Sequence, residues 1–281
     1  MPFTLEILAR PWCVAACALF ASVASAAPAD DRIDAPPAEP APSWEGAIGL
    51  LMSHRPAFSG SDGAVTKLNP GFFLRRGRFS ITNASGFATR RAEDVSRGLG
   101  IDLLQSARVK ANVGLRWDNG RRENSADALR GLGDIRPTAR ARFSMTASLT
   151  PAWRLGLAMS TDLFGRGGGY IGDVSLAREW RVLPKTVLGT AVSLSYAGDR
   201  YLQTWYGITP EQSARTGRPE FQPAAGLRDV SASVGFRSDL SRDWLLIGGI
   251  GTSRLLGDAA RSPLTTSRTG WGVNAGLAWR F

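Results

Sequence analysis

The chain has a single histidine, His54, which directly follows Ser53 and lies shortly before Ser59. A serine hydrolase needs a nucleophile, a histidine base and a polar group that orients the base. His54 with Ser53 or Ser59 could supply the first two, but no signature of an orienting group surrounds them. We therefore expect a protein that is not an enzyme, and a rim lipid hydrolase that uses His54 is a remote alternative.

Residues for metal or cofactor chemistry are also scarce. Both cysteines, Cys13 and Cys17, lie in an apolar amino-terminal segment, and with one histidine they leave no His/Cys cluster for a transition metal. The glycine-rich segment 165–169 is followed by no Lys-Ser/Thr pair and no helical pattern, so it does not match a phosphate-binding loop. We expect no cofactor and no metal site.

Charged side chains instead alternate with apolar ones along several segments, such as 109–117, 134–149 and 153–163. Strict alternation over about 10 residues indicates a β-strand with different surroundings on its two sides. We interpret Asp173 and Glu179 as carboxylates paired with arginines rather than as an acid/base couple. The charged faces supply the candidates for a water-filled lumen: Lys110, Arg116, Arg136, Arg140, Arg142, Arg154, Asp162, Asp173, Glu179 and Arg237.

The carboxy-terminal segment 269–281 shows the alternation most clearly, because one face is apolar throughout and the other is small or polar. Aromatic residues lie near both ends of the apolar face, as in a strand that crosses a bilayer. The terminal Phe281 resembles the signal by which bacterial outer-membrane barrels are recognised for insertion. The candidates for the membrane girdles are Trp44, Trp117, Trp153, Trp180, Tyr196, Trp244, Trp271 and Trp279.

The connections between these segments alternate in length, which predicts the topology. About 12 segments have strand character, and every second connection is short, as in outer-membrane barrels with short periplasmic turns and long outer loops. The short turns lie near Arg76, Gln105, Thr150, Leu183 and Ser241. We predict an all-β fold, a single transmembrane antiparallel up-and-down β-barrel with a polar lumen. A soluble β-sandwich is the alternative, but it leaves the alternation of lengths unexplained.

The amino-terminal residues indicate export. Residues 1–26 have an apolar run too short to span a bilayer and then small residues at 24–26, which is typical of a signal peptide. Residues 27–43 are rich in Pro and Ala and predict a disordered periplasmic leader. We expect residues 44–281 to form the barrel.

The formal net charge of +10 favours an anionic partner. We expect no nucleic acid, because export removes that partner and no helical pattern could enter a groove. Lipopolysaccharide, murein or an anionic solute match the charge better, and we expect contact with outer-membrane lipid. The sequence leaves the oligomeric state open.

Three segments, 206–214, 226–230 and 253–264, resemble the MipA/OmpV family of outer-membrane proteins. The early strand from Trp44 to Ser53 and the segment 70–73 fit the same family. The resemblance implies a small outer-membrane barrel in the Gram-negative cell envelope. It also implies a scaffold in peptidoglycan biosynthesis that brings a lytic transglycosylase and a murein synthase together. Other members are described in adhesion and in antibiotic uptake or export, and the family supplies no catalytic motif.

The sequence therefore predicts a non-enzymatic outer-membrane scaffold for murein enzymes. The main alternative is a narrow channel whose basic lumen favours anions, for small solutes or antibiotics. By the order of the connections, the segment 206–226 faces the outside. A periplasmic partner would then have to bind the short turns, the barrel rim or the leader.

Overall fold

The computed structural model describes residues 44–83 and 98–281. The predicted signal peptide (1–26) and leader (27–43) lie outside the described residues, so both stay predictions. None of the helices within the described ranges is long and apolar enough to cross a membrane.

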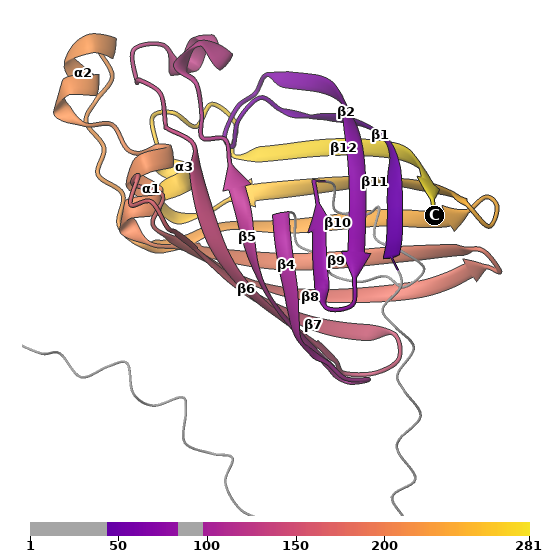
Figure 1. Ribbon diagram of the computed structural model, residues 1–281. Helices are drawn as coiled ribbons and strands as arrows, with labels where there is room; N and C mark the ends of the chain where they lie inside the picture. Colours follow the sequence, from indigo (N-terminus) through magenta and orange to yellow (C-terminus); the bar gives the residue numbers. More distant parts are fainter. Residues whose placement is uncertain (1–43, 84–97) are drawn as a thin grey trace, which may run out of the picture. The chain divides into compact units, whose positions relative to one another are not determined.

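Strands dominate the described residues and close into a barrel in which each strand pairs with its sequence neighbours and β1 pairs with β12 (Figure 1). All pairs are antiparallel, which confirms the predicted fold and strand number. The strands are β1 (Trp44–Pro56), β2 (Ala64–Arg76), β3 (Phe79–Thr82), β4 (Gly98–Gln105), β5 (Val109–Asp118), β6 (Thr138–Ser148), β7 (Trp153–Asp162), β8 (Tyr170–Leu183), β9 (Thr186–Ala197), β10 (Gly226–Asp239), β11 (Trp244–Leu255) and β12 (Thr269–Arg280).

The final strand shows how the alternation becomes two faces. Trp271, Leu277 and Trp279 are exposed on the outside of β12, whereas Ala278 and Arg280 are buried on the inside. The same division along the other strands gives an exterior of large apolar side chains. A closed sheet satisfies its backbone N–H and C=O groups within the protein, so this exterior can face hydrocarbon.

One strand boundary changes the interpretation of a predicted residue. The segment 134–149 was expected to be a strand throughout, but β6 begins only at Thr138. Arg121 and Ile135 form an isolated bridge in the preceding loop, and Pro137 has no N–H to donate to a ladder. Arg136 is therefore an exposed loop residue, and the prediction that it lies on a strand was wrong.

Short helices lie in the long connections, where the sequence analysis expected no helical pattern (Figure 1). They are α1 (Asp199–Tyr206), α2 (Pro210–Thr216), α3 (Gly257–Arg261) and the 3₁₀ turns η1 (Glu123–Ser125) and η2 (Asp127–Leu129). The signals for α2 are local. The Thr209 side chain accepts from the Gln212 backbone N–H, the Gln212 side chain caps the Thr209 N–H in return, and Gly217 ends the helix at φ 68°.

The long loops pack together at the end of the barrel where the helices lie. Leu129 and Leu132 of the β5–β6 loop form a buried apolar cluster with Ile208 and Leu264 from two other loops. A second cluster joins α1 and α3 to the strand ends through Leu202, Ala259 and their neighbours. Buried apolar contacts between loops of different hairpins make this end an ordered cap.

At the opposite end, where the short turns lie, part of the barrel interior is apolar. Ala47, Phe73, Leu245, Ile247 and Ala278 form a buried cluster, with Leu51 packed against it. A Cβ atom added at Gly276 would lie 2.9 Å from Leu51 Cδ1 and 3.2 Å from Ile247 Cγ1, so these side chains fill the space that the glycine leaves. The interior on this side is therefore packed, which the sequence analysis did not anticipate.

The junction of β1 with β12 closes the barrel and tolerates no added side chain at Gly49. A Cβ atom there would lie 2.1 Å from the Leu277 carbonyl oxygen and 2.6 Å from Ala278 Cα. We expect Gly49→Ala to lower the free energy of unfolding by about 1–3 kcal/mol, as overpacking does. The loss is measured as a shift in the urea concentration at which half of the barrel unfolds, followed by the electrophoretic band of the folded protein. Gly226→Ala is the control, because nothing lies within 4 Å of its added Cβ, and equal midpoints for the two variants would contradict the prediction.

Candidate functional site

The predicted lumen residues other than Arg136 lie on strands, on the face opposite the exposed apolar side chains. Most of them line β5 to β8, where the register places Arg116 opposite Arg140 and Arg140 opposite Asp162. Arg237 lies apart from this wall, on β10. Inward residues on the wall strands are Lys110, Arg116, Arg140, Arg142, Arg154, Asp162, Asp173 and Glu179.

Carboxylates and arginines pair along this charged wall. Arg142 Nη1 lies 3.7 Å from Asp173 Oδ2, and the Arg154 guanidinium forms an ion pair with Glu179. Arg142 on β6 reaches Asp173 on β8 across the intervening strand β7, whereas Arg154 on β7 and Glu179 on β8 lie on neighbouring strands. The predicted interpretation of Asp173 and Glu179 as partners of arginines agrees with these contacts, and no acid/base couple is formed by them.

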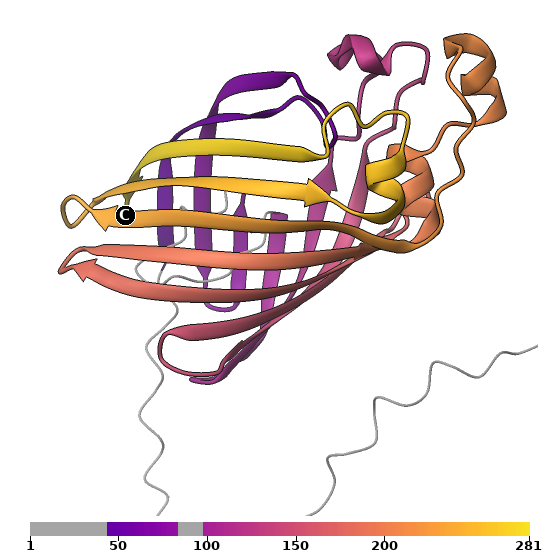
Figure 2. The same cartoon turned by 180° about the vertical axis from the view of Figure 1, so that it is seen from behind.

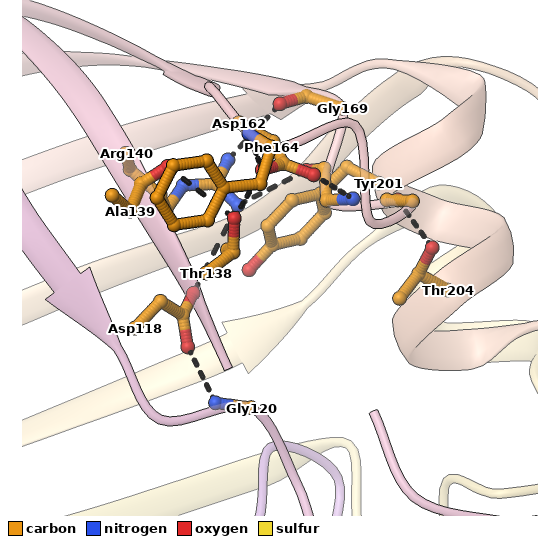
Figure 3. Close-up of polar contacts among 12 residues, drawn as sticks. Asp118, Gly120, Thr138, Ala139, Arg140, Asp162, Phe164, Gly169, Tyr201 and Thr204 are labelled. Carbon is orange, nitrogen blue, oxygen red and sulfur yellow. Dashed lines mark hydrogen bonds and ion pairs between the residues drawn. The ribbon is translucent and has the colours of Figure 1, made fainter. Parts of the chain in front are cut away.

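Arg140 lies beside Gly169 of the β7–β8 loop and Tyr201 of α1 (Figure 3). Its side chain is buried and donates to the carbonyl oxygens of Gly168 at 3.1 Å and Gly169 at 3.2 Å. Asp118 Oδ2 lies 3.9 Å away. These contacts tie β6 to the β7–β8 loop, so Arg140 orders the mouth as well as adding charge to it.

Asp162 orders the same loop from the other side. Its carboxylate accepts from the backbone N–H groups of Phe164 at 3.0 Å and Gly168 at 2.9 Å, and from the Thr138 hydroxyl. With its acceptor sites used in this way, Asp162 is a structural residue of the loop rather than a lumen charge available to a solute.

Arginines also surround the aromatic residues of α1, which the sequence analysis missed. The guanidinium of Arg140 lies 5.3 Å and that of Arg228 lies 5.7 Å from the ring centroid of Tyr201. Arg121 lies 5.9 Å from the ring of Trp205 and donates to the Trp205 carbonyl at 2.9 Å. Cation–π contacts of this kind stabilise partly desolvated arginines. The available signal was the spacing of the two aromatic residues by four, which places them on one face of a helix.

Burial shifts two ionisable groups in the cap. Burial raises the pKa of Tyr206 to about 12, and its hydroxyl donates to Ser59 Oγ at 2.8 Å. Burial lowers the pKa of Arg121 to about 10. At neutral pH Tyr206 is therefore uncharged and Arg121 is charged. Arg121 therefore contacts Trp205 of α1 as a positively charged side chain.

The girdle candidates lie on the outward face near the strand ends. Exposed side chains among them are Trp44, Trp117, Tyr196, Trp244, Trp271 and Trp279. Trp153 and Trp180 are half-buried because the Arg178 guanidinium lies over both rings, at 5.2 and 4.8 Å from their centroids. Arg178 thus faces outward between two indoles, as expected for a long cation at a membrane edge.

The terminal Phe281 extends the pairing of β12 with β1. Its backbone N–H donates to Gly46 O and its own carbonyl accepts from Gly46 N, both at 3.0 Å. Its exposed ring lies 5.3 Å from that of Trp279. The predicted insertion signal is thus an exposed aromatic pair at the closing edge of the barrel, and its recognition stays a prediction.

His54 has no catalytic surroundings. Its Nδ1 lies 2.8 Å from Thr66 Oγ1 and its ring lies 5.4 Å from that of Trp271, on the outward face. Ser53 belongs to the opposite face of β1, and Ser59 is bonded to Tyr206. Alternation along the strand places Ser53 and His54 on opposite faces, so the contacts of His54 give the hydrolase alternative no support. Within the described ranges, no three His, Cys, Asp or Glu side chains gather where they could hold a metal ion.

A closed antiparallel barrel with an apolar exterior and inward charges defines an outer-membrane β-barrel protein. A sequence model of the family described as MltA-interacting protein MipA matches residues 48–281. The chain belongs to this family, which confirms the predicted membership and the outer-membrane location.

Solved structures with a similar fold are distant in sequence. An outer membrane channel from Pseudomonas putida F1 is 14% identical, with 90% of this chain and 100% of that chain covered and a TM-score of 0.43. The NanC porin is 7% identical, with 83% and 98% covered and a TM-score of 0.42. The KdgM porin is 11% identical, with 84% and 99% covered and a TM-score of 0.39. These likenesses concern the fold alone, and no curated protein matches the chain in sequence.

The arginine contacts of Tyr201 make a testable contribution to the cap. We expect Tyr201→Ala to speed proteolysis of the loop 198–225 in the folded barrel, because two cation–π contacts of about 0.5–1 kcal/mol each are lost. Tyr201→Phe keeps the ring and removes only the hydroxyl that accepts from Arg228, so it should stay close to the wild type. Equal proteolysis of the alanine variant and the wild type would contradict a role of these contacts.

Proposed function

We propose that this outer-membrane barrel is a non-enzymatic scaffold that brings a murein synthase and a lytic transglycosylase together. The family description, which names a protein that interacts with MltA, supports a binding role. The packing of the long loops into an ordered cap supports a binding role over transport.

The observation that carries the proposal is the charge of the rim at the short turns. By the rule that outer-membrane barrels have short periplasmic turns, this rim faces the periplasm, where murein enzymes act. Glu45 and Asp243 are the exposed acids that lie there. They are outnumbered by exposed cations on the turns and adjoining strand ends, namely Arg76, Arg78, Arg108, Arg181, Lys185 and Arg242. A rim of one sign attracts and orients partners of the opposite sign.

Binding of purified murein synthase and lytic transglycosylase to the barrel in nanodiscs tests the scaffold. We expect the triple variant Arg108→Glu, Arg181→Glu and Lys185→Glu to bind about tenfold more weakly, since several exposed pairs of up to about 1 kcal/mol each are lost. The matched control reverses Arg122, Arg130 and Arg215, which lie in the loops at the capped end.

The outcomes separate the scaffold from its binding surface. Binding that survives the rim variant but is lost on deletion of residues 27–43 would assign the partner to the leader instead of the rim. Failure of the wild-type barrel to bind either enzyme would overturn the scaffold.

A narrow anion-favouring channel is the second candidate, and Arg116 favours it. This side chain is exposed although it lies on the inward face of β5, so it contacts solvent inside the barrel. In planar bilayers we expect anion-selective steps, and Arg116→Glu should shift the reversal potential toward cations. The Arg122→Glu variant, altered in the outer loop, is the control. Absence of single-channel steps from a folded wild-type barrel would exclude the channel.

A further inference from the structure

The outward face of the barrel has an apolar groove that neither candidate function uses. It has a volume of about 470 Å³ and lies over β6 to β10, which run side by side from the capped end (Figure 2). The side chains that wall it are almost entirely apolar, so its occupant must be a hydrocarbon chain. The walls include Phe143, Leu157, Met159, Val174, Leu194 and Leu227.

The groove exists because one outward position has no side chain. The strand register sets Met159 opposite Gly172 and Gly172 opposite Tyr196. Tyr170 and Val174 lie on the same face of β8 on either side of the glycine. Large neighbours thus surround Gly172, which has no side chain of its own. A Cβ atom added there would have only the Ala158 carbonyl oxygen within 4 Å, at 3.7 Å. A larger side chain would fit there and fill the groove.

The groove belongs to the half of the barrel nearer the cap. Its residues come from the end of β7, the start of β8, the end of β9 and the start of β10, all next to the long loops. With long loops outside, this half lies in the outer leaflet. The chains available to the groove are therefore those of outer-leaflet lipid.

Exposed cations lie where the strands that carry the groove enter the cap. Arg166 of the β7–β8 loop is exposed, lies 5.3 Å from the Phe164 ring and donates to the Pro137 carbonyl. Arg200 of α1 is exposed. A Cβ atom added at Gly169, the residue before β8, would lie 3.1 Å from the Cβ atom of Arg200. Arg166 in the loop before β8 and Arg200 beside Gly169 thus lie next to the start of β8, the strand that carries Tyr170 and Gly172 of the groove.

We propose that the groove at Gly172 and the arginines Arg166 and Arg200 form a binding site for one lipid A unit of lipopolysaccharide. An acyl chain fills the groove, and a phosphate of the same molecule accepts hydrogen bonds from the guanidiniums. Arginine suits this role because its planar donors match phosphate geometry. Basic residues next to a hydrocarbon groove select a lipid by its headgroup as well as by its chains.

The test measures retained lipid A by native mass spectrometry of the folded barrel, extracted in mild detergent and titrated with lipid A. We expect Gly172→Leu to weaken binding about tenfold, because the added side chain replaces the buried chain segment. Ala232→Leu is the control, since it enlarges an outward residue of β10 that does not line the groove. Arg166→Glu with Arg200→Glu should give a similar loss and leaves the strands unchanged, so it tests the site even if Gly172→Leu fails to fold.

Selectivity decides between lipid A and other ligands with the same chemistry. We expect lipid A without phosphates, phosphatidylglycerol and inorganic phosphate each to bind more weakly than lipid A. Arg122→Glu with Arg130→Glu changes the charge by the same amount elsewhere in the outer loops and should leave binding unchanged. Equal retention by all variants, or equal binding of phosphatidylglycerol, would overturn the site.

Discussion

Backbone hydrogen bonding in a medium without water is the constraint on which the rest of the structure depends. A strand in hydrocarbon must pair on both edges, and the pairing of β1 with β12 removes the last free edges. Closure then requires side chains to alternate between lipid and interior along every strand. Two features lie at this closing junction. Gly49 lets β1 approach β12 closely, and Trp279 and Phe281 form an aromatic pair at its edge.

Inside the barrel, charge is balanced locally instead of being spread evenly. The ion pairs of Arg142 with Asp173 and Arg154 with Glu179 lie on the wall formed by β6 to β8. An apolar cluster around Phe73 fills part of the interior at the end with the short turns. At the mouth, Arg140 and Arg228 contact Tyr201 and so couple the charged wall to the cap. The interior is thus divided into regions of different polarity, which favours a structural role for many of its charges.

The two ends of the barrel present different chemistry to their surroundings. At the end with the long loops, the loops pack through apolar side chains, and exposed arginines lie near the start of β8, which carries part of a groove in the lipid-facing surface. The end with the short turns is a rim of exposed cations with few acids. In the function proposed above, this rim binds the protein partners. The groove, by contrast, would bind lipid in the outer leaflet.

The sequence by itself determined the fold class and the strand number, because alternation is a local property of a strand between lipid and water. It predicted inward faces for Arg142 and Glu179, but it extended the strand to Arg136, where a loop bridge and a proline interrupt the ladder. Only the tertiary structure decided which charges pair, that Tyr201 lies between arginines, and that Gly172 leaves a groove. These features depend on contacts between segments far apart in the chain, which periodicity along one strand does not encode.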